Sequence, residues 1–213
     1  MNLLNENRIL WKFTKGAPEW YILSIIIYQI FNPTLTGLKT FLLMMAVGQS
    51  NFVLKHMIFK PLYKFTGIYK LPIIGIGTRP EKATNCSSLI KDLLNKKDNK
   101  KSKTFGMPSG HSQIAWTFTT FTVLQLFDKG NEMTIMEKDT DSGSSLDNAK
   151  YKILKTIYKY KYEVSALLII YSILVSFSRV YVEGCHTIEQ VTIGMIFGII
   201  FGYLAYYIIQ KYI

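Results

Sequence analysis

Five apolar runs dominate the sequence and limit what it can fold into. Each is rich in Ile, Leu, Phe and Tyr, and they cover residues 20–31, 36–59, 114–127, 164–177 and 191–209. A helix needs about 20 apolar residues to cross a bilayer, a length that the second run reaches and the last approaches. The other three reach it only with their polar flanks. The pattern predicts an all-α fold, a polytopic membrane helical bundle of about five to six spans, rather than a soluble bundle with buried helices.

The length of 213 residues suits one domain. We therefore expect a single integral-membrane domain over residues 1–213, with polar loops at about 60–107 and 128–163. The chain has a formal net charge of +11, and residues 60–107 are strongly basic. A basic loop between spans commonly contacts anionic headgroups or lies on the cytoplasmic side. Because this loop lacks a recognisable nucleic-acid-binding fold, we predict no nucleic-acid partner.

The cysteines and glycines add two smaller expectations. Cys86 and Cys185 are the only cysteines, too few to imply a disulfide framework, so we interpret both as packing or loop residues. Gly194, Gly198 and Gly202 recur every four residues in the last apolar run, a spacing typical of closely packed membrane helices.

Three fragments place cationic or titratable residues beside apolar sequence. They are "GIGTRP", which ends at Arg79-Pro80, "PSGH" at residues 108–111, and "SRVYVEGCHTIEQV", which begins at Ser178. If each apolar run crosses the membrane once, two crossings separate the last fragment from the first. All three fragments are therefore expected on one membrane face.

Together these fragments contain what phosphate chemistry requires. A phosphoryl group in transfer carries negative charge, which is stabilised by cationic side chains and backbone N–H donors. Arg79 and Arg179 supply planar guanidinium groups that bind two oxygens at once. Ser109 and Gly110 stand where a helix is expected to begin, and the free N–H groups there would form an anion cradle.

The fragments also hold two of the three histidines of the chain, His111 and His186. Imidazole titrates near neutral pH, so one ring could attack phosphorus while the other protonates the leaving oxygen. The sequence shows no zinc-ligand motif, and we predict no metal site.

"RP" at 79–80, "PSGH" at 108–111 and "SR…H" at 178–186 resemble the three signatures of the type 2 phosphatidic acid phosphatase superfamily. Its members are integral-membrane lipid phosphate phosphatases. The resemblance implies that His186 is a nucleophile forming a phosphohistidine and that His111 is the general acid. It also implies a phosphate clamp made of Arg79, Ser109, Gly110 and Arg179.

The same resemblance implies a lipid phosphate substrate and no metal or organic cofactor. The lipid could be phosphatidic acid or a polyprenyl diphosphate of the dolichyl type. The sequence does not indicate whether the protein is a monomer or an oligomer. Two alternative functions belong to other classes of protein than an enzyme. One is an inactive relative that binds lipid headgroups, and the other is a small transporter with a polar path of Asn51, Lys55 and His56.

The first signature departs from the family pattern. It usually has a lysine separated from Arg-Pro by six residues, where this chain has Pro72. Lys70 lies close by, but "NFVLK", which ends at Lys55, resembles the lysine-bearing helix end of dolichyl diphosphate phosphatases. The lysine role is open between Lys55 and Lys70.

The third signature departs too. The family usually has an aspartate four residues after the nucleophilic histidine, and this chain has Gln190 there with Glu189 beside it. "HTIEQV" resembles the "HT..QV" of the dolichyl diphosphate phosphatase branch. On a helix Gln190 lies over His186, and Glu189 could also reach it. We favour Gln190 as the residue that orients His186.

The side of the membrane that holds the site is also open. The basic residues 60–107 favour the cytoplasm by the positive-inside rule. The resemblance to dolichyl diphosphate phosphatases implies the lumenal side instead.

Overall fold

The computed structural model describes residues 8–31, 34–67, 70–72, 74–81, 83, 86, 105–130 and 145–212. The helices are α1 (Arg8–Lys15), α2 (Ala17–Phe31), α3 (Leu35–Val53), α4 (Lys60–Thr66), α6 (Gly110–Leu126), α8 (Ser145–Lys159), α9 (Lys161–Phe177) and α10 (Ile188–Tyr212). Two π-helical segments, η1 (Leu54–Phe59) and η3 (Ser178–Val182), extend α3 and α9. A short antiparallel hairpin pairs β1 (Lys70–Leu71) with β2 (Gly75–Ile76).

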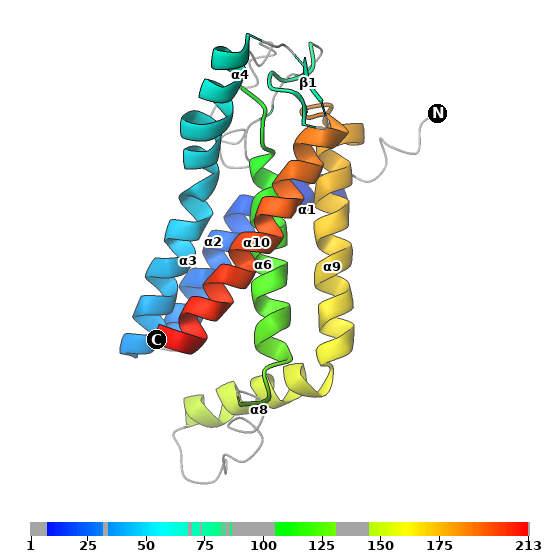
Figure 1. The fold of residues 1–213 in the computed structure, drawn as a ribbon. Helices are drawn as coiled ribbons and strands as arrows, with labels where there is room; N and C mark the ends of the chain where they lie inside the picture. The colour runs from blue at the N-terminus through cyan, green and yellow to red at the C-terminus, as the bar shows by residue number, and fades with distance from the viewer. Residues whose placement is uncertain are drawn as a thin grey trace.

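The long helices α2, α3, α6, α9 and α10 lie side by side and form the body of the molecule (Figure 1). Each contains one of the five apolar runs, which confirms the expected helical bundle. Within the described residues, three helical stretches are long and apolar enough to cross a membrane, namely Leu35–Thr66, Lys161–Val182 and Ile188–Tyr212. The structure therefore supports membrane-spanning helices, but it does not fix the count at five to six.

The glycine spacing in α10 marks its contact with α6, the most extensive helix pairing in the described residues. A Cβ atom on Gly194, Gly198 or Gly202 would lie 2.5–2.7 Å from a backbone carbonyl oxygen of α6. Only glycine permits so close an approach, so the packing prediction is confirmed. Because α6 begins in the second fragment and α10 begins just after the third, this contact brings those fragments together.

The interpretation of residues 60–107 and 128–163 as polar loops is wrong in part. Helix α4 occupies residues 60–66 as a continuation of α3 and η1. Helix α8 occupies residues 145–159 and lies across the end of the bundle, and α9 already begins at residue 161 (Figure 1). Polar and apolar residues alternate with helical spacing in α8, a pattern that composition alone did not reveal. The most basic part of the first segment, residues 91–103, lies outside the described residues.

Candidate active site

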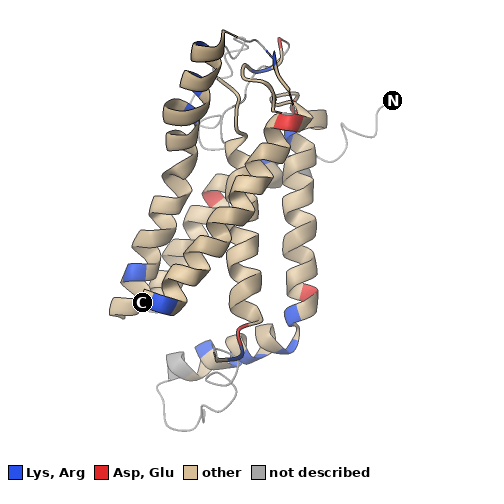
Figure 2. Ribbon diagram, in the orientation of Figure 1, with Lys and Arg blue, Asp and Glu red and all other residues tan. Residues whose placement is uncertain are grey.

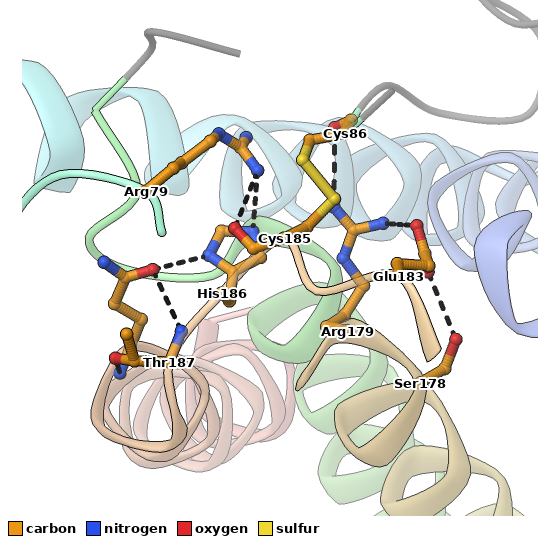
Figure 3. The surroundings of a disulfide bond; sticks show 9 residues. Arg79, Cys86, Ser178, Arg179, Glu183, Cys185, His186 and Thr187 are labelled. Atoms are coloured by element: carbon orange, nitrogen blue, oxygen red, sulfur yellow. Dashed lines mark hydrogen bonds and ion pairs between the residues drawn. A yellow bond between two sulfur atoms is a disulfide. The ribbon is translucent and has the colours of Figure 1, made fainter. Parts of the chain in front are cut away.

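The first and third fragments meet at the end of the bundle where α10 begins, as Figure 3 shows. Nη1 of Arg79 lies 3.3 Å from Nε2 of His186 and donates to the carbonyl oxygen of Cys185 at 3.2 Å. His111 interacts electrostatically with Arg79, Arg179 and His186. The three fragments therefore meet at one end of the bundle, as expected if they share a membrane face.

Gln190, rather than Glu189, contacts the imidazole of His186. Oε1 of Gln190 lies 3.0 Å from Nδ1 of His186, and the Gln190 side chain is fully buried. Gln190 Nε2 donates to the carbonyl oxygens of Ile76 and Thr78 at 2.8 and 2.7 Å. Its amide is thereby tied to the segment that leads into Arg79.

These contacts determine which nitrogen of His186 carries the proton. The amide nitrogen of Gln190 faces two carbonyl acceptors, so its oxygen must be the atom that faces His186. That oxygen can only accept, which places a hydrogen on Nδ1. The guanidinium of Arg79 can only donate, which requires a lone pair on Nε2. Both neighbours select the same neutral tautomer, with the hydrogen on Nδ1 and the lone pair on Nε2.

The electrostatics of the site keep His186 neutral. Burial, followed by the charges of Arg179 and Arg79, lowers the pKa of His186 well below its usual value near 6.5. Burial and the charge of Arg179 lower the pKa of Arg79 to about 10, so its guanidinium stays charged at neutral pH. The result is a neutral imidazole beside two guanidinium cations.

The structure changes part of what was expected for the anion cradle. Ser109 occupies the N-cap position of α6, but its side chain makes no capping hydrogen bond. Its backbone N–H donates to the carbonyl oxygen of Gln190 at 3.0 Å, so that N–H is not free for a phosphate. Oγ of Ser109 is buried and has no partner within the described residues. The cradle at this helix end therefore offers the Ser109 hydroxyl in place of its N–H. Gly110 follows, and an added Cβ there would lie 3.0 Å from Oδ1 of Asn51.

His111 has one nitrogen fixed and one available. The backbone of Lys15, at the end of α1, accepts a hydrogen bond from the His111 ring. Nε2 of His111 is buried without a partner in the part of the chain that the structure describes. The bonded nitrogen is therefore Nδ1, which leaves Nε2 for exchange of a proton with a bound group. No sequence signal pointed to this role for the Lys15 backbone.

Arg179 is almost fully buried, with 1% of its side chain exposed, and is held from two sides. Its Nη1 forms an ion pair with Glu183, and Nη2 donates to the carbonyl oxygen of Cys86 at 3.4 Å. Glu183 in turn accepts from Oγ of Ser178 at 3.1 Å. Nε of Arg179 has no partner within the described residues and is the atom left for an anion. The sequence analysis missed Glu183, although its spacing of four residues from Arg179 is a signal for an ion pair on a helix.

The interpretation of the two cysteines as packing or loop residues is wrong. Cys86 and Cys185 form a disulfide bond with a Cα–Cα distance of 5.5 Å (Figure 3). They are 99 residues apart, and a pair so distant in sequence gives no pattern from which pairing can be deduced. Cys185 directly precedes His186, so the bond is part of the site.

Of the two candidate lysines, Lys55 is the one near the two arginines of the site, Arg79 and Arg179. It interacts electrostatically with Arg79, Arg179 and His186. Lys70 stands on β1, exposed, and interacts with Glu189. The described residues between "NFVLK" and Arg79 include the end of the helix, η1 and α4, and the β1–β2 hairpin.

A cavity of about 390 Å³ opens beside the site between α2, α3 and α6. Gly110, His111 and Lys55 contribute to its polar part, and Ile22 and Ile114 to its apolar part. Among the described residues, no group of three or more His, Cys, Asp or Glu side chains could hold a metal ion.

Comparison with known proteins agrees with this arrangement. A family model, described as the PAP2 superfamily, matches residues 37–213. The chain belongs to the PAP2 superfamily. No curated protein and no solved structure matches it. Membership of the PAP2 superfamily supports a phosphatase acting on phosphate esters in general. Helices α1 and α2 precede the matched residues, so the contact of Lys15 with His111 comes from a part of the chain outside the PAP2 match.

Proposed function

We propose that this PAP2 protein is an integral-membrane phosphatase that hydrolyses a lipid phosphate or diphosphate through a phosphohistidine on His186. The observation that carries the proposal is the pair of contacts on the His186 ring, with Gln190 at Nδ1 and Arg79 at Nε2. A neutral imidazole whose Nε2 lone pair faces a partly buried guanidinium is arranged to attack an electrophile that arrives as an anion.

In the first step, Nε2 of His186 forms a bond to phosphorus while the bond from phosphorus to the leaving oxygen breaks. Once the anionic substrate lies beside it, His111 is protonated on Nε2 while Nδ1 still donates to the Lys15 backbone, and it gives the Nε2 proton to the leaving oxygen. The Nδ1 hydrogen stays on His186, where the Gln190 amide oxygen stabilises the positive charge that develops on the ring. Arg79, Nε of Arg179 and Lys55 offset the charge on the phosphoryl oxygens.

In the second step, a water molecule attacks phosphorus and the bond from phosphorus to Nε2 breaks. The electron pair of that bond returns to Nε2, and the proton released by the water goes to His111. Both histidines then regain their starting states. Two steps of this kind need no cofactor, because the chain supplies the nucleophile, the acid and the cations.

The cavity between α2, α3 and α6 supports a lipid as the substrate. Its polar part includes His111, and its apolar part continues between helices rather than into solvent-exposed loops. A phosphate group at His111 would place an attached hydrocarbon chain against Ile22 and Ile114. The resemblance of "NFVLK" and "HTIEQV" to dolichyl diphosphate phosphatases favours a polyprenyl diphosphate over phosphatidic acid.

The test is phosphate release by detergent-purified protein from polyprenyl diphosphate, polyprenyl phosphate and phosphatidic acid, with a chelator present. We expect release from at least one lipid, fastest from the diphosphate, and none from the His186→Ala variant. Failure of the parent protein to hydrolyse any of the three would contradict the proposal and favour a headgroup-binding or transport role. Activity that requires a divalent ion would contradict the phosphohistidine chemistry.

A further inference from the structure

The disulfide at the site holds more than two loops together, because both of its cysteines use their carbonyl groups to hold an arginine. The carbonyl oxygen of Cys185 accepts from Arg79, and that of Cys86 accepts from Arg179. The backbone N–H groups of Cys185 and His186 both donate to the carbonyl oxygen of Arg179, at 3.0 and 3.2 Å. Each arginine of the cluster is thus oriented by one half of the cystine, as Figure 3 shows.

The two segments that the disulfide joins have different anchors elsewhere. Residues 76–78 are held by the Gln190 amide, and α10 is held by its packing against α6. Cys86 lies eight residues beyond Thr78, and its bond to Cys185 ties this distant part of the segment to the site. Loss of the bond would release the carbonyl that orients Arg179.

We propose that the Cys86–Cys185 cystine is a positioning element of the site, holding the two carbonyl groups that orient Arg79 and Arg179. The proposal rests on the proposed function for its effect on turnover, but its structural part does not. The cystine itself takes no part in the reaction. Its integrity sets the geometry of the cations and of the segment that carries His186.

The test compares the oxidised protein with protein reduced by a phosphine, with complete reduction confirmed by thiol counting. We expect reduction to lower kcat/KM by about tenfold or more, the size found for residues that orient reactive groups. Inhibition by orthovanadate, a phosphate analogue, should weaken in parallel, and reoxidation should restore both values. Reduction should also speed hydrogen exchange at the backbone amides of residues 178–187.

The matched control is the Cys86→Ser, Cys185→Ser double variant. Since the chain has no other cysteine, the reductant should leave this variant unchanged, with an activity equal to that of the reduced parent. An unchanged kcat/KM after full reduction would overturn the proposal, even if hydrogen exchange increased. If the oxidised parent hydrolyses no lipid, the proposed function fails, and hydrogen exchange alone decides: faster exchange on reduction supports the positioning role, and equal exchange overturns it.

A second inference, independent of the first, comes from α8 at the opposite end of the bundle. Lys152 and Lys159 are exposed and lie seven residues apart, about two helical turns, so they share one face. Ile153 and Tyr160 follow them with the same spacing and are 55% and 46% exposed. An exposed basic stripe therefore runs beside an exposed apolar stripe. Figure 2 shows the lysines along α8 and at its junction with α9.

The surroundings of α8 fix its orientation across the bundle. The hydroxyl of Tyr158 donates to the carbonyl oxygen of Gln125 at the end of α6, at 3.2 Å. Lys161, where α9 begins, stands 5.5 Å from the ring centroid of Phe127. Lysines combined with tyrosine and phenylalanine rings are typical of the boundary between lipid and water.

We infer that α8 lies in the membrane surface and binds anionic lipid headgroups through Lys152 and Lys159. Ile153 and Tyr160 would enter the outer part of the acyl region, as in other interfacial helices. The occupant follows from the charge, because within α8 and its junction with α9 the described lysine side chains outnumber the described acidic ones.

The test counts phosphatidylserine molecules that stay bound when the protein leaves nanodiscs of phosphatidylserine and phosphatidylcholine, measured by native mass spectrometry. We expect the Lys152→Glu, Lys159→Glu double variant to retain fewer than the parent. Lys64→Glu, an exposed site on α4 at the other end, should retain the parental number. Equal retention by all three proteins would overturn the inference.

Spin labels give a readout of position. Both labels would be introduced in the cysteine-free background. A label at Ile153→Cys should be more accessible to oxygen than a label at Lys152→Cys. The label at Lys152→Cys should be the more accessible of the two to a polar nickel complex. Equal and high accessibility to the nickel complex at both positions would show α8 in water, which would also overturn the inference.

Discussion

The two ends of the bundle treat their cations in opposite ways. At the site end, the side chain of Arg179 is 1% exposed and its guanidinium lies beside fixed carbonyl groups and the buried, neutral His186. At the α8 end, Lys152 and Lys159 are exposed. Burying a cation costs free energy, which the ion pair with Glu183 offsets in part, and Nε of Arg179 is left without a partner in the described residues. The contrast indicates that the site end is built to receive an anion, and the α8 end to lie against a charged surface.

The ends also differ in what they imply about compartment. Disulfide bonds persist in oxidising compartments, so the cystine predicts a lumenal or external position for the site end. A lysine-bearing interfacial helix suits the anionic cytoplasmic leaflet. Both features predict an orientation opposite to the one that the basic residues 60–107 favour.

The largest expected difference between the two ends is in labelling by a membrane-impermeant maleimide, which should be all-or-none. In the cysteine-free background and in sealed vesicles with the cytoplasmic side outward, Lys152→Cys should be labelled directly. Lys70→Cys, exposed on β1, should be labelled only after permeabilisation. The reverse pattern would break the comparison and place the site in the cytoplasm.

The largest effect on turnover is expected at His186. His186→Ala should lower kcat by at least about 10³-fold, because no other neutral imidazole stands beside Arg79 within the described residues. Thr156→Ala, at an exposed position on α8, should leave kcat unchanged. Initial rates on one lipid, with gel filtration to check folding, make the measurement. Residual activity within tenfold of the parent would remove His186 from the mechanism.

An intermediate effect is expected for Gln190. Gln190→Leu should cost about ten- to a hundredfold in kcat, since the ring loses the acceptor at Nδ1. A carboxylate at this position would be a stronger partner for the ring but would leave the carbonyl groups of Ile76 and Thr78 without their donor. Gln190→Glu should therefore also lower activity. Glu189→Gln is the matched control, and a larger loss there than in Gln190→Leu would reverse the assignment.

The smallest effect is expected for the first-signature lysine. Lys55→Ala should lower kcat/KM by about tenfold, because it removes one of several cations around the phosphate. Lys55→Arg should recover part of the loss, and Lys70→Ala should have no effect. Kinetics on a single diphosphate lipid would show this order, and a greater loss in Lys70→Ala would move the role to the hairpin.

The sequence was sufficient for the five apolar helices and for the convergence of the three fragments, but not for α4 and α8. Apolar length and the glycine spacing of α10 are strong local signals, and the order of spans decides which fragments share a face. The helical position of Gln190, four residues after His186, also predicted its contact with the ring.

The remaining features depend on contacts between distant segments. The Cys86–Cys185 bond joins residues 99 apart, and the Lys15 backbone reaches His111 from a helix with no motif. The Ser109 N–H was expected to be free, but the start of α6 packs against α10 closely enough for Gln190 to accept from it. Which of Lys55 and Lys70 lies near the arginines likewise depends on the path of the chain after α3, which the sequence alone did not show.

The central claim is tested most directly by trapping the intermediate. Purified His111→Ala protein, in which release of phosphate should be slowed, would be mixed with a labelled diphosphate lipid, quenched in alkali and analysed by peptide mass spectrometry. A phosphohistidine is stable in alkali and lost in acid. The account predicts an alkali-stable phosphate on His186, absent from a His111→Ala, His186→Ala double variant. Phosphate on another residue, or lipid turnover without any phosphorylated histidine, would contradict it.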